Sequence, residues 1–297
     1  MDENPTLPLE GFEERDIMTD LIPANDMGAR AGSKRRLVRK WLNRVTLGVA
    51  ILAPLTFILS ALGYKIGLMS LKLSLLTLTF KIGPLLLGLG LVLAIASFIM
   101  AWVVQPRKGF VIAGVAALVA VFGSAKVAKT AKIGATLPVI HDITTDTQNP
   151  PVFGEVILAE RSAEDGVNPV EYTGKKAPAK AADGSPTEKL VSALQTKAYP
   201  QIRPLVLSEQ PDVVFGEALA TAKSLGWKIK EEDLATGRID ATDTTFWYGF
   251  DDDVTVRLRA SEGGGTIVDV RSLSRVGQSD LGANAARITA FLEQLAE

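Results

Sequence analysis

The chain has 297 residues, a formal net charge of −1 and no cysteine, which excludes disulfides, thiol catalysis and iron–sulfur clusters. The charges are segregated: residues 1–29 hold eight acids and one base, and residues 30–44 hold seven bases and no acid. Residues 133–297 carry 25 acids and 16 bases, which excludes a nucleic-acid-binding surface built from cationic side chains.

Residues 1–44 form an acidic and then basic tail, which we expect to be disordered and cytoplasmic. The first apolar run begins only after residue 44 and is too long for the core of a cleavable signal peptide. We therefore expect this run to remain in the protein as a membrane anchor.

Three apolar runs predict membrane-spanning helices near residues 45–64, 83–104 and 109–126. The third run is at the short limit, and the long side chain of Lys126 extends it by reaching toward the membrane surface. Between the first two runs, residues 65–82 alternate apolar and polar side chains. This pattern fits a strand or an extended start of the second helix, and both alternatives remain open.

The distribution of Lys and Arg predicts the orientation of the spans, because basic residues concentrate on the cytoplasmic side. Seven bases precede the first span, and Arg107 and Lys108 join them in the short hairpin between the second and third spans. Six lysines lie on the opposite side: Lys65, Lys72, Lys81, Lys126, Lys129 and Lys132. We therefore expect a multi-pass protein of a bacterial inner membrane, with a cytoplasmic N-terminus and an extracytoplasmic C-terminal domain.

Residues 136–297 have the composition of a soluble α+β domain. Within it, residues 160–188 are rich in Gly, Pro and charges, and we expect a mobile loop there. An amphipathic helix over 212–225 precedes about four strands, and a second such helix begins at Ser279. The chain thus predicts a three-span α-helical membrane bundle followed by an antiparallel sheet flanked by two helices.

The last two predicted strands form a hairpin whose register follows from their alternating pattern. Val256 is expected opposite Val270, and Arg257 opposite Asp269. One face of the sheet is then aliphatic and the other is charged.

Three segments of the domain are similar to one known family. They read IHDITTDTQNPPVF from Ile140, GRIDATDTTFWYGFDDDVTVRLR from Gly237 and GTIVDVRSLSRVGQSDLGANAARITAFLEQL from Gly265. Together they resemble DUF1499, a bacterial family of unknown function whose members often carry membrane helices before the domain. The resemblance covers about residues 140–297. It implies that this segment folds as the family's domain, and it implies no particular activity, because none is established for the family.

His141 is the only histidine, and it lies beside Asp142 and near Asp146. A His–Asp base or a metal site is one interpretation of this cluster. However, one histidine cannot supply a multi-histidine zinc site, and the chain has no G-x-S-x-G nucleophile motif. We favour the alternative that His141 and Asp146 form local hydrogen bonds that shape the loop.

The acidic run Asp251, Asp252 and Asp253 is a candidate calcium site, because Ca²⁺ prefers oxygen ligands. Its spacing matches no EF-hand loop. The favoured alternative is that one aspartate forms an Asx-turn before the strand while the others are solvated.

The strongest candidate for an anion site lies between the last strand and the N-terminus of the last helix, at Arg271, Ser272, Arg275 and Ser279. We favour the structural alternative, in which Ser279 or Asp280 caps the helix and the two arginines pair with Asp243 or Asp251–Asp253.

Trp247 and Tyr248 belong to an aromatic run that offers either a surface for a ligand or protein partner, or core packing. The expected role is therefore binding or envelope assembly, with the lipid bilayer, an envelope protein or a small anionic ligand as partner. The alternative is a hydrolase or metal-dependent enzyme centred on His141, Asp142 and Asp146. A sensor or transporter role for the helices is a third interpretation. The sequence predicts no cofactor.

Overall fold

The computed structural model describes residues 24–297, with side chains from Arg30 onward, and the chain divides into two compact units. The first unit contains the residues up to Ile51 together with Gly88–Ala120, and the second contains Leu52–Leu87 and Val121–Glu297. The acidic part of the predicted N-terminal tail, before Ala24, lies outside the described residues.

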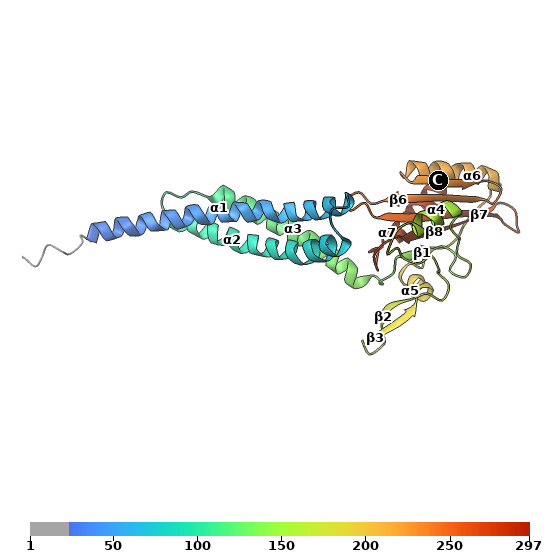
Figure 1. Ribbon diagram of the computed structural model, residues 1–297, viewed down its shortest axis with the longest axis horizontal. Helices are drawn as coiled ribbons and strands as arrows, with labels where there is room; N and C mark the ends of the chain where they lie inside the picture. Colours follow the sequence, from blue (N-terminus) through green and yellow to red (C-terminus); the bar gives the residue numbers. More distant parts are fainter. Residues whose placement is uncertain (1–23) are drawn as a thin grey trace, which may run out of the picture. The chain divides into compact units, whose positions relative to one another are not determined.

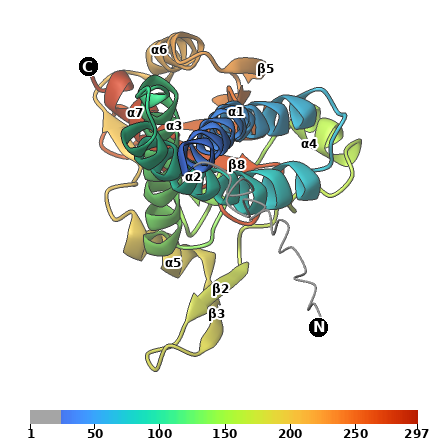
Figure 2. The same cartoon turned by 90° about the vertical axis from the view of Figure 1, so that its left-hand side faces the viewer.

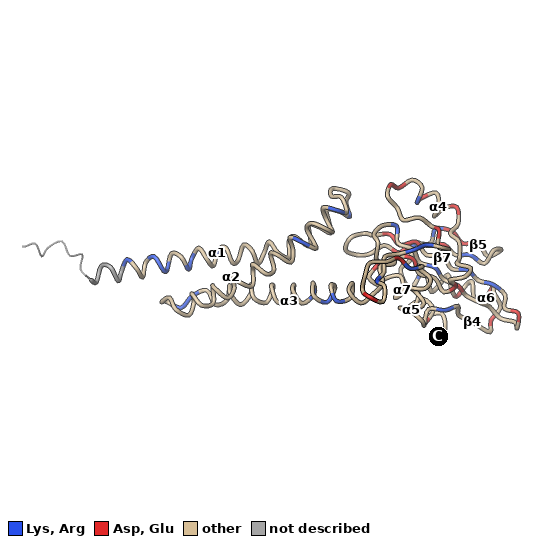
Figure 3. The backbone as a smooth tube through the Cα atoms, turned by 90° about the horizontal axis from the view of Figure 1, so that it is seen from below, with Lys and Arg blue, Asp and Glu red and all other residues tan. Residues whose placement is uncertain are grey.

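Three long apolar helices precede the α+β domain: α1 (Ala24–Lys65), α2 (Gly83–Val103) and α3 (Phe110–Thr136). Each belongs to a helical stretch long and apolar enough to cross a membrane. The prediction of a disordered tail is wrong for residues 24–44, which form the start of α1 because Ala, Arg, Lys and Leu favour helix. Figure 3 shows basic residues along α1 and α3, and basic and acidic residues together in the α+β domain.

Small side chains and one buried arginine hold the helices of the first unit together. Ala50, Ala94 and Ala116 form a buried cluster, and small residues of this kind let helix backbones approach closely. The buried Arg39 guanidinium donates a hydrogen bond of 2.7 Å to the carbonyl of Val104, just after the end of α2. A basic side chain therefore binds a carbonyl group that follows the helix.

The segment before α2 is an 11-residue π-helix, η1 (Lys72–Ile82), which runs directly into α2. The extended start of the second helix, one of the two alternatives for residues 65–82, is therefore confirmed from Lys72 onward. Ser74 of η1 is buried, and its hydroxyl donates a 2.6 Å hydrogen bond to the carbonyl of Ser60 in α1. Long π-helices are rare, and short ones often mark functional positions.

The α+β domain contains one antiparallel sheet of six strands. Its order is β1 (Asp142–Thr144), β8 (Thr266–Ser274), β7 (Asp251–Ala260), β6 (Arg238–Thr244) and β5 (Lys228–Asp233), with β4 (Leu205–Leu207) also paired with β8. The predicted antiparallel sheet is confirmed. The sheet also contains the short strands β1 and β4, which were not among the predicted strands, and both pair with β8.

The prediction of a loop at residues 160–188 is wrong for residues 160–162, which end α4 (Glu155–Ser162), and for residues 176–188, which belong to a separate hairpin. The hairpin pairs β2 (Lys176–Lys180) with β3 (Pro186–Leu190) and extends away from the main sheet (Figures 1 and 2). Its turn contains Asp183 and Gly184, and the positive φ of 83° at Gly184 suits glycine. Helix α5 (Val191–Ala198) follows directly.

The predicted register of the last hairpin is confirmed: Val256 pairs with Val270, and Arg257 pairs with Asp269. The aliphatic face of the sheet packs against α6 (Pro211–Ser224) and α7 (Ala283–Leu295), which correspond to the two predicted helices. Helix α7 begins later than predicted, because Gly282 before it has a left-handed backbone conformation.

The core on this face is centred on Phe291, which is fully buried and stacks on Trp227 with ring centroids 5.0 Å apart. We expect Phe291→Ala to lower the free energy of unfolding by about 3–5 kcal/mol, because it removes this contact and leaves a cavity. Denaturant unfolding of the full chain in detergent micelles measures the change. The matched control is Leu234→Ala at an exposed position, where a change within about 0.5 kcal/mol is expected. Equal effects of the two substitutions would contradict this assignment of the core.

Candidate functional site

The second face of the main sheet carries charged side chains that are buried. Alternate residues of β7 and β8 point to this face, among them Asp253, Asp269 and Arg271, and all three are buried. Phe153 and Ile157 pack with Leu273 of β8 in a small apolar cluster of this region. Buried charges are tolerated only when they are paired, so the partners of these groups determine what the face can bind.

Arg271 is 3% exposed and binds Asp142 in a bidentate pair, with Nε 3.0 Å from Oδ1 and Nη2 2.9 Å from Oδ2. Its remaining donors reach the backbone carbonyls of Pro151 and Val170. The guanidinium also lies over the ring of Phe153, 5.0 Å from the ring centroid. The predicted partners of Arg271, Asp243 or the Asp251–Asp253 run, are therefore wrong. The arginine is fully engaged within the protein.

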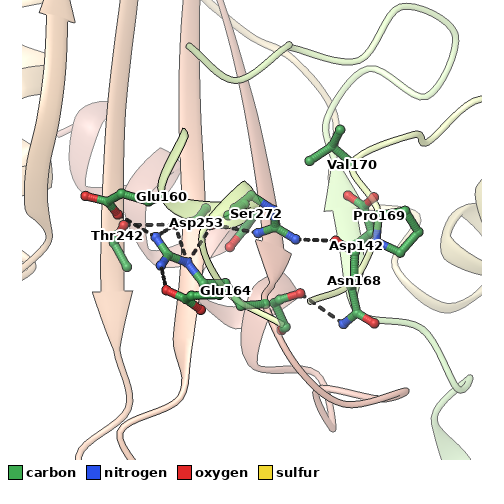
Figure 4. Close-up of polar contacts among 12 residues, drawn as sticks. Asp142, Glu160, Glu164, Asn168, Pro169, Val170, Thr242, Asp253 and Ser272 are labelled. Carbon is green, nitrogen blue, oxygen red and sulfur yellow. Dashed lines mark hydrogen bonds and ion pairs between the residues drawn. The ribbon is translucent and has the colours of Figure 1, made fainter. Parts of the chain in front are cut away.

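Arg275 and Arg161 share the carboxylate of Asp253, which is completely buried. Arg275 Nη2 lies 2.9 Å from Asp253 Oδ1, and Arg161 Nη1 lies 2.6 Å from Oδ2. Arg275 also contacts Glu160 at 2.7 Å and Glu164 at 2.5 Å (Figure 4). The predicted pairing of Arg275 with the acidic run is confirmed. Hydrogen bonds from Lys230 and Arg275 hold the pKa of Glu160 below its ordinary value.

The three aspartates of the acidic run do not converge on one point. Asp251 accepts a 2.5 Å hydrogen bond from the hydroxyl of Thr244, and Asp252 pairs with Arg287 at 2.7 Å. All three belong to β7, so the predicted Asx-turn before the strand is wrong. Within residues 24–297 no group of three or more acidic or histidine side chains is placed to hold a metal ion.

The serines of the predicted anion site make internal hydrogen bonds. Ser272 Oγ donates to Asn284 Oδ1 at 2.6 Å, and Ser279 Oγ accepts from the backbone N–H of Leu281 at 3.3 Å. Asp280 accepts from the N–H groups of Gly282 and Asn284 at 2.9 and 2.8 Å. The expected helix cap is thus made by Asp280.

His141, Asp142 and Asp146 are close in sequence, but their side chains bind different partners. Asp142 binds Arg271, whereas Asp146 accepts the N–H groups of Gln148 and Asn149 at 3.1 and 2.9 Å. Asp146 therefore shapes its own loop, as the favoured interpretation predicts. The local hydrogen bond predicted for His141 is wrong, because its ring nitrogens lie beside Gln278 and Lys175, which are distant in the sequence.

The side-chain partner of His141 is Lys175, which sequence reasoning did not identify. Lys175 Nζ lies 3.1 Å from His141 Nε2 and 3.6 Å from Asp142 Oδ2, and its side chain is only 14% exposed. Burial and the neighbouring ammonium lower the pKa of His141, and burial lowers the pKa of Lys175. Lys175 lies in a Gly-, Pro- and Lys-rich segment, which carries no pattern that would mark a buried lysine.

The aromatic run, residues 246–250, is partly core and partly free surface. Tyr248 and Phe250 stack at 5.1 Å, and Phe250 also packs on Tyr64 of α1 at 5.2 Å. The Tyr248 hydroxyl contacts those of Ser60 and Thr79. By contrast, Phe246 and Trp247 are 80% and 63% exposed. Packing therefore applies to Tyr248, whereas Trp247 lies on the surface.

A family model described as a protein of unknown function, DUF1499, matches residues 142–295. The chain belongs to the DUF1499 family. The match confirms the resemblance noted in the sequence and extends from β1 to the end of α7. No curated protein matches this DUF1499 chain.

The contribution of the charged face to the stability of this DUF1499 protein can be tested at the buried carboxylate of Asp253. We expect Asp253→Asn to lower the free energy of unfolding by about 3–5 kcal/mol, because two buried arginines lose their shared counter-charge. The control is Glu232→Gln in the exposed pair with Lys223, where the change should stay below about 1 kcal/mol. Chemical denaturation measures both, and a loss at Asp253 no larger than that of the control would refute the structural role.

Proposed function

We propose that this DUF1499 protein is anchored in a bacterial inner membrane by α1, α2 and α3, and that its α+β domain is an extracytoplasmic binding module. Three stretches long and apolar enough to cross a membrane support the anchor. No Asp or Glu lies between Arg30 and His141, so the acidic groups that often mark an ion path are missing from this region. An anchor is therefore favoured over a transporter.

The observation that carries the proposal is the contact of the aromatic run with the end of α1, within the second unit. Tyr64 and Lys65 are the last residues of α1, and aromatic and lysine side chains are typical of the boundary between membrane and water. Lys65 Nζ donates a 3.0 Å hydrogen bond to the carbonyl of Phe246. The exposed rings of Phe246 and Trp247 are then at the level of the lipid head groups. The domain is held at the bilayer surface by this loop.

The binding role is favoured over the enzymatic alternative by the partners of the candidate catalytic groups. A hydrolase or metal-dependent enzyme at His141 needs a carboxylate that is free to orient the ring or to bind a metal. Asp142 is held by Arg271, and Asp146 by its own loop and by Arg257 at 3.3 Å. An envelope protein or a small anionic ligand remains the proposed partner of the module.

The orientation is supported by the bases next to the spans, which number nine on the proposed cytoplasmic side and six on the other. It is testable because the chain has no cysteine, so one introduced cysteine is its only thiol. We expect Ser185→Cys, in the exposed turn of the β2–β3 hairpin, to react with a membrane-impermeant maleimide on intact spheroplasts. Lys34→Cys, on the exposed start of α1, is expected to react only after lysis. The opposite labelling pattern would overturn the orientation.

The position of the aromatic run is also tested with single cysteines introduced into the cysteine-free chain. A polarity-sensitive dye on Trp247→Cys should emit at shorter wavelength in liposomes, and lipids with a quencher near the head group should quench it. The matched control is Leu234→Cys, an exposed apolar position in the turn between β5 and β6, where a water-like emission is expected. Water-like emission at both positions would show that the run is not in the membrane boundary and is free for a protein partner.

A further inference from the structure

A small cavity lies beside His141 and Lys175, apart from the aromatic run. Its volume is about 120 Å³, which suits a molecule of a few carbon atoms. Polar groups form part of the wall and apolar side chains the rest; the lining includes His141, Asp142, Lys175, Ile140, Ala177 and Val191.

The polar wall of the cavity carries more positive than negative charge. Asp142 is the only acidic residue in the lining, and both of its oxygens already accept hydrogen bonds from Arg271. Lys175 lies 3.6 Å from the same carboxylate, so one anion faces two largely buried cations. An uncompensated ammonium in such a place is costly, and a bound anion removes that cost.

His141 directs the ammonium without adding charge. Its Nδ1 lies 3.1 Å from the backbone carbonyl of Gln278, which can only accept a hydrogen bond. Nδ1 therefore carries the ring proton, and Nε2 is left as an acceptor for Lys175 at 3.1 Å. With one ammonium hydrogen directed to His141 and a second to the Pro169 carbonyl at 3.4 Å, the third is available to a ligand and to Asp142.

We propose that this cavity binds a small organic carboxylate, with its anionic end on Lys175 and a short hydrocarbon chain against Ile140, Ala177 and Val191. These three side chains are buried, and they offer no hydrogen bonds to the additional oxygens of phosphate or sulfate. A carboxylate satisfies the ammonium at one end and buries apolar surface at the other. The site does not depend on the membrane orientation or on the aromatic run.

The test is calorimetric titration of the full chain in detergent micelles with sodium butyrate, at constant ionic strength. We expect saturable binding by the wild type and at least tenfold weaker binding by Lys175→Met. Ala177→Leu, which fills the cavity without changing charge, should weaken binding as strongly. The matched control is Lys189→Met in β3, an exposed lysine outside the cavity lining, which should bind butyrate like the wild type.

Absence of saturable butyrate binding in the folded wild type would overturn the proposal, as would unchanged affinity in Lys175→Met. Inorganic phosphate that binds as tightly as butyrate would overturn the carboxylate assignment. Lys175→Met is expected to keep or raise the melting temperature, because it removes a largely buried charge. If this variant does not fold, Ala177→Leu decides: unchanged butyrate affinity in that variant refutes the cavity as the site.

Discussion

The ion pair between Asp142 and Arg271 is the interaction on which the rest of the domain depends. Asp142 lies on β1, the first strand after α3, and Arg271 lies on β8, which pairs with β1, β4 and β7. The pair thus joins the start of the domain to its central strand. The guanidinium also lies over the rings of Phe153 and Tyr172, from the segment between β1 and β2. The guanidinium therefore contacts that segment through two rings and two carbonyls, those of Pro151 and Val170.

Buried ion pairs also join other segments along the charged face of the sheet. Asp253 holds Arg161 and Arg275, and Asp269 holds Arg257 at 2.8 Å. Burying such groups is costly, and their mutual attraction offsets the cost only where every partner is present. These arginines are therefore engaged within the protein, and Arg275 of the candidate anion site is among them, as the favoured structural alternative predicts. The regions proposed for binding are the exposed rings of the aromatic run and the cavity beside Lys175.

Features that depend on local patterns could be predicted from the sequence. The three apolar runs, the two amphipathic helices and the hairpin register that pairs Arg257 with Asp269 all follow from periodicity within short segments. The pairing of Arg275 with Asp253 was also predictable, because the two residues lie on or beside neighbouring strands, 22 positions apart.

The contacts that define the candidate sites join segments far apart in sequence. Arg271 and Asp142 are separated by 129 positions, and Lys175 and His141 by 34. No periodicity reports on such pairs, and the composition around Lys175 is typical of a loop. The helical start of α1 differs from the prediction for another reason: a run of basic residues is typical of a disordered tail, but the individual residues favour helix.

The charged groups of this face neutralise one another within the protein, and a double-substitution cycle at Asp142 and Arg271 measures this coupling. The free energy of unfolding should fall by about 3–5 kcal/mol in Asp142→Asn, because Arg271 is left buried without its counter-charge. Adding Arg271→Met should restore much of that loss, since the unpaired charge is then gone. A loss below about 1 kcal/mol in Asp142→Asn, or strictly additive effects of the two substitutions, would contradict the account.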